Sequence, residues 1–443
     1  MPEWTEMTPE EKREERYKSW LTTPDTVNAE VARLYQQRVQ RIIDALSLKK
    51  PDKVPVFIQF GFIPAMYAGY THAEVMRDYQ KMHLAWLKFI QDYDFSDLDT
   101  FHAGIDLGKV LEILDYKMYK WAGHGAPDNS ISQYVENEYM SADEYDYWLD
   151  DPSDYHFRVY MPRVMGALSA FRKLPPFSAI GGPFIFNLAA YGNPEVQAAF
   201  NALVEAGNEI NRFRNVAISV NEKALELGLS SHYAPIGTTP PEAPFDAIGN
   251  HRRGTIGIMT DMYRRPDKLL EVLEKVTQRM IKQIPQTVIP GASPIVFMGL
   301  HRGADGFMSE QQFTTFYWPF LRRIALAFVD EGYMPCLFAE GGYNSRLEIV
   351  NDFPKGKVMW HFDRTDMVRA KQILGDSACI AGNVPTSLLV TGKPAYVKEY
   401  CRKLIEDVGR DGGFILAPGA GSNDARLENL FAVAQAATEF GKY

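Results

Sequence analysis

Short apolar runs that end in a polar residue or a glycine turn recur through the last third of the chain. The run 334–339 is followed by Glu340 and two glycines, a pattern typical of a buried strand that delivers one charged side chain to a loop. Three further runs, at 357–363, 378–383 and 413–419, end in a similar way and are separated by helical segments. Alternating strands and helices favour a parallel α/β fold, in which the polar tips gather at the carboxyl ends of the strands.

Eight apolar runs of this kind are spread along the whole chain. They begin near residues 54, 97, 177, 294, 334, 357, 377 and 413, with helical segments between them. Eight strands close a (β/α)8 barrel, so the predicted fold class is α/β with a TIM barrel. An open doubly wound sheet is the alternative, but no Gly-x-Gly-x-x-Gly follows an early strand to indicate dinucleotide binding.

The domain prediction is a helical extension at 1–50 followed by the barrel at 51–443. Long insertions are expected near 115–176 and 200–255. The first is rich in Asp, Tyr and Trp and contains no clean strand, whereas the second includes a proline-rich stretch, 232–250, that is expected to be a loop.

Composition excludes several classes of protein. The net charge of −9 gives no reason to expect nucleic acid or an anionic membrane as partner, because both reward clustered Lys and Arg. No leader-like start and no apolar stretch long enough to span a bilayer is visible, so a cytoplasmic location is expected. Three scattered cysteines do not make a disulfide framework or a zinc-finger spacing.

The C-terminal third also carries a series of motifs in a particular order and spacing. The series consists of Leu337-Phe-Ala-Glu-Gly-Gly, Gly382-Asn-Val-Pro, the interval 391–406, Phe414-Ile-Leu-Ala-Pro-Gly-Ala-Gly and Leu427-Glu-Asn. In these motifs the chain resembles the uroporphyrinogen decarboxylase superfamily of (β/α)8 barrels, which contains the haem-pathway decarboxylase and corrinoid-linked methyltransferases.

The resemblance implies an enzyme whose active site lies at the carboxyl mouth of the barrel. Two departures from the family patterns decide which reaction is favoured. The decarboxylases carry Arg-Gln-Ala-Gly-Arg-Tyr after the first strand, where this chain has Gln59-Phe-Gly-Phe-Ile-Pro without an arginine. The thiol-methylating members carry a zinc site made of His-x-Cys and a later Cys, and these places are held here by Phe338, Glu340 and Ala420.

We therefore expect a methyltransferase component that moves a methyl group from a small donor, such as an ether, to a corrinoid (cobalamin) bound on a separate protein. The cobalamin-module signature Asp-x-His-x-x-Gly is missing from the chain, so the corrinoid protein would act in trans. Family analogy also suggests a homodimer.

The candidate site residues stand at or just beyond the expected strand ends. Glu340, His361 and Asp363 are the predicted catalytic residues, since carboxylate and imidazole groups exchange protons and protonate leaving groups. Glu340, His361 and His301 are the predicted ligands if zinc or a harder metal is bound. The residues expected to bind substrate are Gln59, Asp106, His301, Arg302, Phe338 and Asn383.

Two other functions remain open from the sequence. The first is a uroporphyrinogen decarboxylase-type carboxy-lyase, which requires two or more arginines that point into the mouth. The second is a non-catalytic barrel subunit, in which Glu340 and His361 would be tied to internal partners with no cavity above them.

Overall fold

A five-stranded parallel sheet forms the most regular part of the computed structural model, which describes residues 3–235 and 241–443. Its strand order is β10-β9-β8-β7-β6. The strands are β6 (Ile295–Leu300), β7 (Met334–Ala339), β8 (Met359–Phe362), β9 (Cys379–Val384) and β10 (Phe414–Pro418). These five strands confirm the last five predicted runs, and their unbroken apolar character fits strands that are buried on both faces.

Three further segments continue the sheet towards a closed barrel. Residues 54–60 run beside β10, where Val56 forms a parallel bridge with Leu416. Strand β1 (Thr100–Phe101) pairs in parallel with β5 (Ser230–Ser231), and the amide of Ala234 donates to the carbonyl of Ile295 at 2.7 Å, which joins β5 to β6. The amide of Val56 donates to the Oδ2 of Asp99 at 2.8 Å, next to β1. The arrangement is the predicted (β/α)8 barrel with five long and three short members.

The third predicted strand is wrong. Residues Phe177–Ala179 form a 3-10 helix on the inserted region, where Phe177 is 75% exposed. The barrel position is taken instead by β5, a pair of serines without an apolar run. The first predicted strand, 54–60, is also less regular than expected, since only one of its residues forms a bridge.

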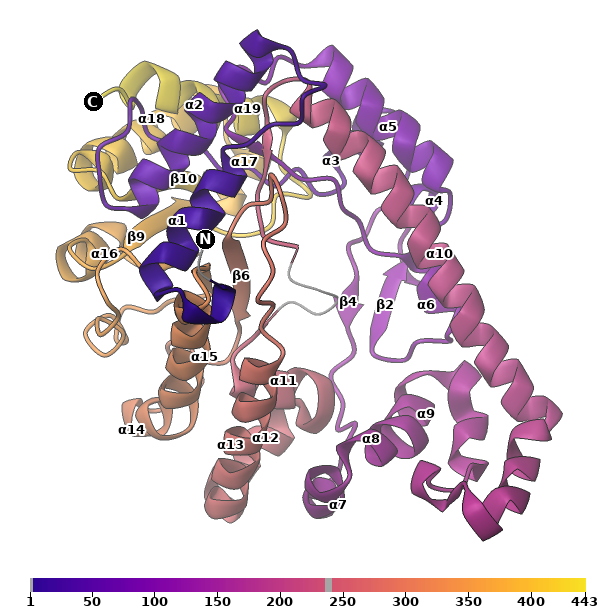
Figure 1. Ribbon diagram of the computed structural model, residues 1–443. Helices are drawn as coiled ribbons and strands as arrows, with labels where there is room; N and C mark the ends of the chain where they lie inside the picture. Colours follow the sequence, from indigo (N-terminus) through magenta and orange to yellow (C-terminus); the bar gives the residue numbers. More distant parts are fainter. Residues whose placement is uncertain (1–2, 236–240) are drawn as a thin grey trace.

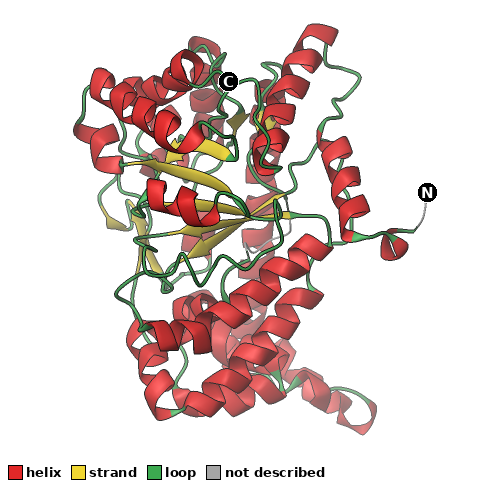
Figure 2. Ribbon diagram, turned by 90° about the vertical axis from the view of Figure 1, so that its left-hand side faces the viewer, coloured by secondary structure: helices red, strands yellow, loops and turns green. Residues whose placement is uncertain are grey.

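Helices surround the sheet on its outer face (Figures 1 and 2). Those of the N-terminal part and first insertion are α1 (Pro9–Trp20), α2 (Ala29–Leu46), α3 (Ile63–Tyr67), α4 (His72–Val75), α5 (Tyr79–Asp92), α6 (Gly108–Ile113), α7 (Tyr145–Asp150), α8 (Pro152–Asp154), α9 (Met161–Val164) and α10 (Pro194–Leu225). Those of the second half are α11 (Pro244–Ile248), α12 (Gly254–Arg264), α13 (Pro266–Lys282), α14 (Glu310–Gln312), α15 (Trp318–Asp330), α16 (Met367–Leu374), α17 (Thr386–Thr391), α18 (Pro394–Leu404) and α19 (Leu427–Phe440).

The insertion after β1 projects away from the barrel as a largely helical arm, with α10 along its edge (Figure 1). It contains a small sheet of β2 (Tyr119–Ala122), β3 (Gly125–Ala126) and β4 (Gln133–Tyr134), which corrects the expectation that 115–176 holds no strand. The arm has its own apolar cluster, in which Leu168 and Phe171 are fully buried. In the second insertion, the expected loop at 232–250 contains α11, and residues 236–240 of that loop lie outside the described residues.

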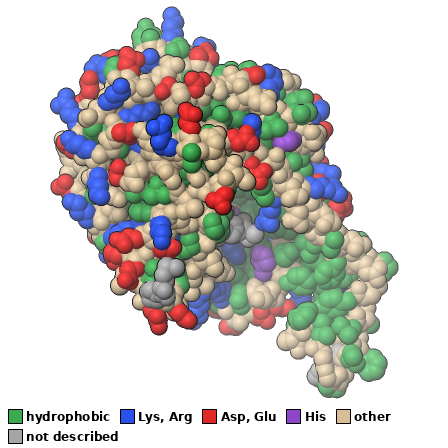
Figure 3. Space-filling model, turned by 45° about the horizontal axis from the view of Figure 1, so that its top comes forward, with side chains coloured by type: hydrophobic (Ala, Val, Ile, Leu, Met, Phe, Trp, Pro, Cys, Tyr) green, Lys and Arg blue, Asp and Glu red, His purple; other side chains and the backbone are tan. Residues whose placement is uncertain are grey.

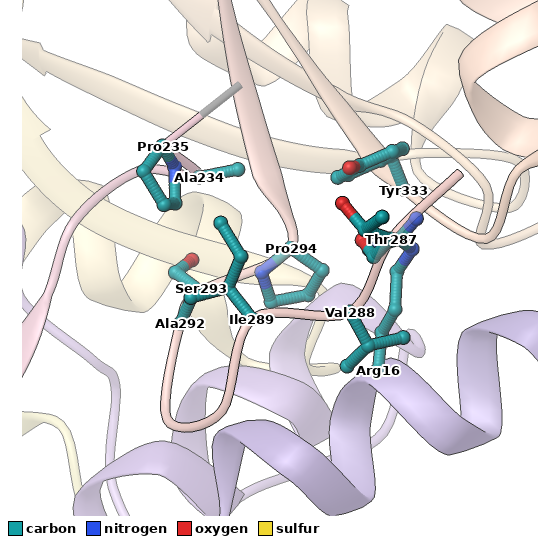
Figure 4. Close-up of a pocket in the computed structure, with 10 residues that line it drawn as sticks. All are labelled: Arg16, Ala234, Pro235, Thr287, Val288, Ile289, Ala292, Ser293, Pro294 and Tyr333. Carbon is teal, nitrogen blue, oxygen red and sulfur yellow. The ribbon is translucent and has the colours of Figure 1, made fainter. Parts of the chain in front are cut away.

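The N-terminal helices pack against the barrel, where Trp20 and Tyr35 share one apolar cluster with inward-facing residues such as Cys336 and Met359. Arg16 of α1 fixes this packing (Figure 4): its Nε donates to the carbonyl of Glu331 at 2.8 Å and its guanidinium lies 3.6 Å from the ring centre of Tyr333. The adjoining cavity of about 20 Å³ lies near the amino ends of β6 and β7, the stabilising side of such a barrel. Within the described ranges, no helix has the length and apolar character needed to cross a membrane.

Candidate active site

Two side chains at the carboxyl ends of neighbouring strands meet at the mouth of the barrel. His301 follows β6 and Glu340 follows β7, and the Nδ1 of His301 lies 3.0 Å from the Oε2 of Glu340. Both side chains remain partly open to solvent, with exposed fractions of 40% and 43%. Since a carboxylate oxygen accepts, the histidine donates its Nδ1 hydrogen to Glu340.

The surroundings of His301 favour its protonated form. Burial by itself lowers the pKa of the imidazole, but the hydrogen bond to Glu340 and the negative charges of Asp246, Glu340 and Glu242 outweigh burial, and the net effect raises its pKa. With Nδ1 bound to Glu340, a protonated His301 has its Nε2 hydrogen left to give.

Gly299 indicates where this second nitrogen lies. A Cβ atom placed on Gly299 would be 3.4 Å from the Nε2 of His301 and 3.7 Å from the Cε1 of Phe297. Because Phe297, Gly299 and His301 alternate along the chain, they lie on one face of β6, which faces the barrel interior. The Nε2 edge of the imidazole is therefore folded back over Gly299 towards the interior.

Asp246 of α11, which the sequence reasoning missed, holds the loop that carries His301. Its side chain is completely buried and accepts hydrogen bonds from the backbone amides of His301 (3.0 Å) and Arg302 (2.9 Å). The hydroxyl of Tyr317 donates to the same carboxyl at 2.5 Å. Burial raises the pKa of Asp246. The positive charge of His301 and the hydrogen bond from Tyr317 lower this pKa, but by less than burial raises it.

A cavity of about 50 Å³ lies inside the barrel. This exceeds the roughly 10–15 Å³ that one water molecule needs, so the space can take a small group. Its lining residues are Phe57, Gln59, His232, Tyr233, Phe297, Phe338, His361, Pro418, Ala420, Gly421 and Ser422, none of which is a carboxylate, lysine or arginine. Phe338 lies between Phe297 and His361, with ring centres 5.5 Å and 4.8 Å away.

The two histidines of the cavity wall are held neutral. Burial lowers the pKa of His361 to about 4 and that of His232 to about 3. The Nε2 of His361 lies 2.8 Å from the carbonyl oxygen of Pro418, which can only accept, so this nitrogen carries the hydrogen and Nδ1 keeps a lone pair. That Nδ1 is buried and has no hydrogen-bond partner among the described residues.

Asp363, Asn383 and Asp106, which were also predicted as site residues, lie in three different environments. Asp363 accepts from the amide of Gly341 at 3.0 Å and so ties the loop of Glu340 to β8. Asn383 is buried and donates to the carbonyl of Thr365, which indicates a structural contact. Asp106 is exposed and makes no hydrogen bond or ion pair to a described residue.

Two of the predicted substrate-binding residues are engaged by the protein itself. Gln59 reaches the cavity and donates to the hydroxyl of Tyr233 at 3.0 Å. Arg302 is 5% exposed, and its guanidinium contacts Asn250 and Thr255.

The predicted metal ligands do not assemble into a metal site. Among the described residues no group of three His, Cys, Asp or Glu is placed to hold an ion, and His361 is committed to Pro418 rather than to the pair of His301 and Glu340. Burial raises the pKa of Cys336, Cys379 and Cys401, which opposes the thiolate form that zinc requires. The residues present therefore do not fit the family's zinc site.

A second histidine and carboxylate pair lies near the mouth and was also missed. The Nε2 of His251 is 2.6 Å from the Oε1 of Glu242, and Asn250 donates to the other oxygen of Glu242 at 2.9 Å. Glu242, Asp246 and His232 all fall in the stretch that was expected to be a loop. Its length and its prolines were the only signals that this stretch holds residues of the mouth.

Comparison with known proteins agrees with the barrel fold. The family model for uroporphyrinogen decarboxylase (URO-D) matches residues 238–440. A uroporphyrinogen decarboxylase of Syntrophotalea carbinolica is 26% identical over 245 residues, which cover 54% of this chain and 69% of that protein. Among solved structures, a methyltransferase from Methanosarcina mazei is similar with a TM-score of 0.55 and 16% identity, and the match covers 92% of this chain and 98% of that one. At this identity the structural likeness concerns the fold.

Proposed function

The chain belongs to the uroporphyrinogen decarboxylase superfamily, and from this premise we propose that it is a methyltransferase component. It would take a methyl group from a small donor, an ether being favoured, and pass it to a corrinoid carried by a separate protein. The reaction would take place where the mouth meets the interior cavity.

One arrangement carries this proposal: His301 is paired with Glu340, and its Nε2 lies over Gly299, close to Phe297, whose ring lines an uncharged, aromatic cavity. Breaking the bond between a methyl group and an ether oxygen leaves an alkoxide, which is a poor leaving group unless it is protonated. A cavity without ionised side chains suits a neutral methyl donor, because buried charges in a ligand would need partners.

Each residue has a defined part in this reaction. As the carbon–oxygen bond breaks, the oxygen keeps the bonding electron pair and takes the Nε2 hydrogen of His301. Glu340 stabilises the imidazolium beforehand, and Asp246 fixes the backbone of His301. The corrinoid, when bound by its partner protein, supplies the nucleophile that accepts the methyl group.

This assignment moves the acid role from His361, where we expected it from sequence, to His301. A histidine with a pKa of about 4 is neutral near pH 7, and the one hydrogen of His361 is donated to Pro418. His361 fits better as a neutral wall of the cavity beside Phe338.

The carboxy-lyase alternative has weaker support. A porphyrinogen with many carboxylates needs several free cations. At the strand ends, however, Arg302 contacts Asn250, Arg346 donates to the carbonyl of Met308, and Arg364 lies 3.6 Å from Asp363. The alternative of a non-catalytic subunit required internal partners for Glu340 and His361, which His301 and Pro418 provide, but it also required that no cavity lie above them, whereas His361 lines one.

Access for a partner protein is consistent with the shape of the surface. Figure 3 shows a hollow between the barrel and the projecting arm, with histidine side chains in view inside it. A corrinoid protein would have to reach the mouth through such an opening.

The test is an assay of methyl transfer with purified protein, free cob(I)alamin as acceptor, and anisole or methanol as donor. We expect cob(I)alamin to be consumed in proportion to the demethylated product, and uroporphyrinogen to lose no carbon dioxide. Release of carbon dioxide from uroporphyrinogen, without methyl transfer from any ether or alcohol, would reject the proposal in favour of the carboxy-lyase.

A further inference from the structure

One segment of the projecting arm, residues 174–193, exposes apolar side chains and contains no Asp, Glu, Lys, Arg or His. Four of its large side chains stand open to solvent: Phe177 is 75% exposed, Ile185 56%, Phe186 85% and Leu188 46%. Figure 3 shows hydrophobic side chains gathered over the arm. Monomeric soluble proteins rarely leave such a group uncovered, so this segment has the character of an interaction surface.

The segment is fixed by the rest of the arm before anything covers it. The Nδ2 of Asn187 donates to the carbonyl of Ala179 at 2.8 Å, which joins the 3-10 helices Phe177–Ala179 and Gly182–Gly192. Tyr191 packs against the buried apolar cluster of the arm. The inner side of the segment is thus anchored, whereas its outer side faces solvent. A surface that is already ordered loses little conformational freedom when a partner binds.

The charges around the segment indicate what kind of partner it fits. Of the two basic residues that precede it, Lys173 forms an ion pair with Glu195, and Arg172 donates to the carbonyl of Pro162 at 3.2 Å. Attraction to an anionic bilayer needs free Lys and Arg beside the apolar face, and these two are engaged.

The same lack of charge favours a second copy of the chain over a different protein. Different proteins usually recognise each other through opposite charges, and the segment has none to offer. Two copies with a net charge of −9 each repel one another, but two uncharged faces can meet without bringing like charges together.

We propose that residues 174–193 form the contact between two copies of this chain in a homodimer with two-fold symmetry. A two-fold contact brings the same surface of both copies together, so an uncharged apolar face is complementary to itself. A stable interface takes about 20–30 residues from each side. The segment has twenty residues, and among those with described side chains only Leu174 is buried. None of the residues assigned to methyl transfer takes part, so the dimer does not rest on that assignment.

The experiment is sedimentation velocity on the full-length protein over a range of concentrations. The wild type should sediment with twice the mass of one chain. Phe186→Glu and Ile185→Glu each place a charge in the contact on both copies, and each should raise the dissociation constant of the dimer at least tenfold. Ile256→Glu is the matched control, because it changes an isoleucine of α12 that is 79% exposed and lies outside the segment. This control should dimerise like the wild type.

Hydroxyl-radical footprinting of the wild type tests the same contact without any substitution. Phe177 and Phe186 should become protected as the protein concentration rises, whereas Tyr263 on α12, which is 74% exposed, should stay reactive. A wild type that remains monomeric at every concentration would overturn the proposal, and so would a dimer that persists unchanged in Phe186→Glu. Binding of the wild type to phosphatidylcholine vesicles, lost in Phe186→Glu, would overturn it by assigning the segment to a bilayer.

Discussion

The Nδ1 of His301 lies 3.0 Å from the Oε2 of Glu340, although the two residues are 39 positions apart in the sequence. The pair forms because β6 and β7 are parallel neighbours in register, with Leu300 opposite Ala339. Each strand delivers its next residue to the same place at the mouth. The order and register of the strands therefore place the proposed proton donor, His301, beside Glu340.

Glu340→Gln should lower the pKa of His301, because the variant removes the charge that stabilises the imidazolium. Histidine titration followed by NMR would measure this change directly. For methyl transfer, the pH above which activity declines should move to a lower value. Glu310→Gln, an exposed change on α14, is the matched control and should leave the titration unaltered. An unchanged pKa of His301 in Glu340→Gln would contradict the pairing.

The same pair gives a stability contribution with a definite sign. Since the folded-state pKa of His301 is raised, the contribution is fully present below the ordinary pKa of histidine and is lost as the pH rises through the folded value. Both side chains are partly exposed, and solvent screens the charge interaction between them, so the effect on the free energy of unfolding should be small. A double-mutant cycle with His301→Gln and Glu340→Gln at pH 6 and pH 9 measures the coupling energy between the two side chains. The coupling should be larger at pH 6, and a larger coupling at pH 9 would contradict the raised pKa of His301.

Acidification should destabilise the protein through its neutral, buried histidines. The pKa of His232 is about 3 when folded, so between pH 7 and pH 5 only the unfolded chain gains its proton. This removes about 2 kcal/mol from the free energy of unfolding for His232 alone. Urea denaturation at both pH values should show a smaller loss in His232→Gln than in the wild type. Equal losses would show that His232 is protonated in the folded protein.

Asp246→Asn should be costly, because the carboxyl accepts from two backbone amides and from Tyr317 in a fully buried place. Hydrogen bonds to a charged group are worth about 1.5–3 kcal/mol, and we expect a loss of stability in that range. Tyr317→Phe removes one of these donors and leaves the amide contacts, so its cost should lie at the low end of that range, about 1.5 kcal/mol. Methyl transfer should fall more in Asp246→Asn than in Tyr317→Phe, measured at a temperature where both variants are folded.

Zinc is not expected to be part of this site. The family's ligand places hold Phe338, Glu340 and Ala420, and the three cysteines are buried with raised pKa values. Elemental analysis should therefore find no stoichiometric zinc, and treatment with a chelator should leave methyl transfer unchanged. Stoichiometric zinc that is lost in both Glu340→Ala and His301→Ala would show that harder ligands have rebuilt the site.

The long strands of the barrel were predictable because each combines an apolar run with a polar tip. β7 with Glu340 and β6 with His301 are such cases, and both tips proved to lie at the mouth. The third strand was not predictable, since Ser230–Ser231 has no apolar pattern and its place was given to the apolar run at Phe177, which lies exposed on the arm. Local hydrophobicity cannot distinguish a buried strand from an apolar stretch on an insertion.

The site was predictable only to the level of individual strand ends. Which tips meet depends on register and side-chain direction, so the sequence grouped both His361 and His301 with Glu340, whereas in the structure Glu340 pairs with His301 and His361 bonds to Pro418. Asp246 and Glu242 lie in a stretch without strand or motif signals, and they reach the mouth only because the chain folds back over β6 as α11. Their roles follow from tertiary contacts that no local pattern records.

The central claim, that His301 protonates the leaving oxygen, is tested most directly by measuring methyl transfer by His301→Gln with two donors. One donor is an alkyl methyl ether, whose leaving oxygen needs a proton, and the other is a methyl aryl ether with a nitro group, whose leaving oxygen does not. We predict that the variant loses about 10²–10⁴-fold in rate with the alkyl ether and far less with the nitroaryl ether. Equal losses with both donors, or no loss with either, would contradict the claim.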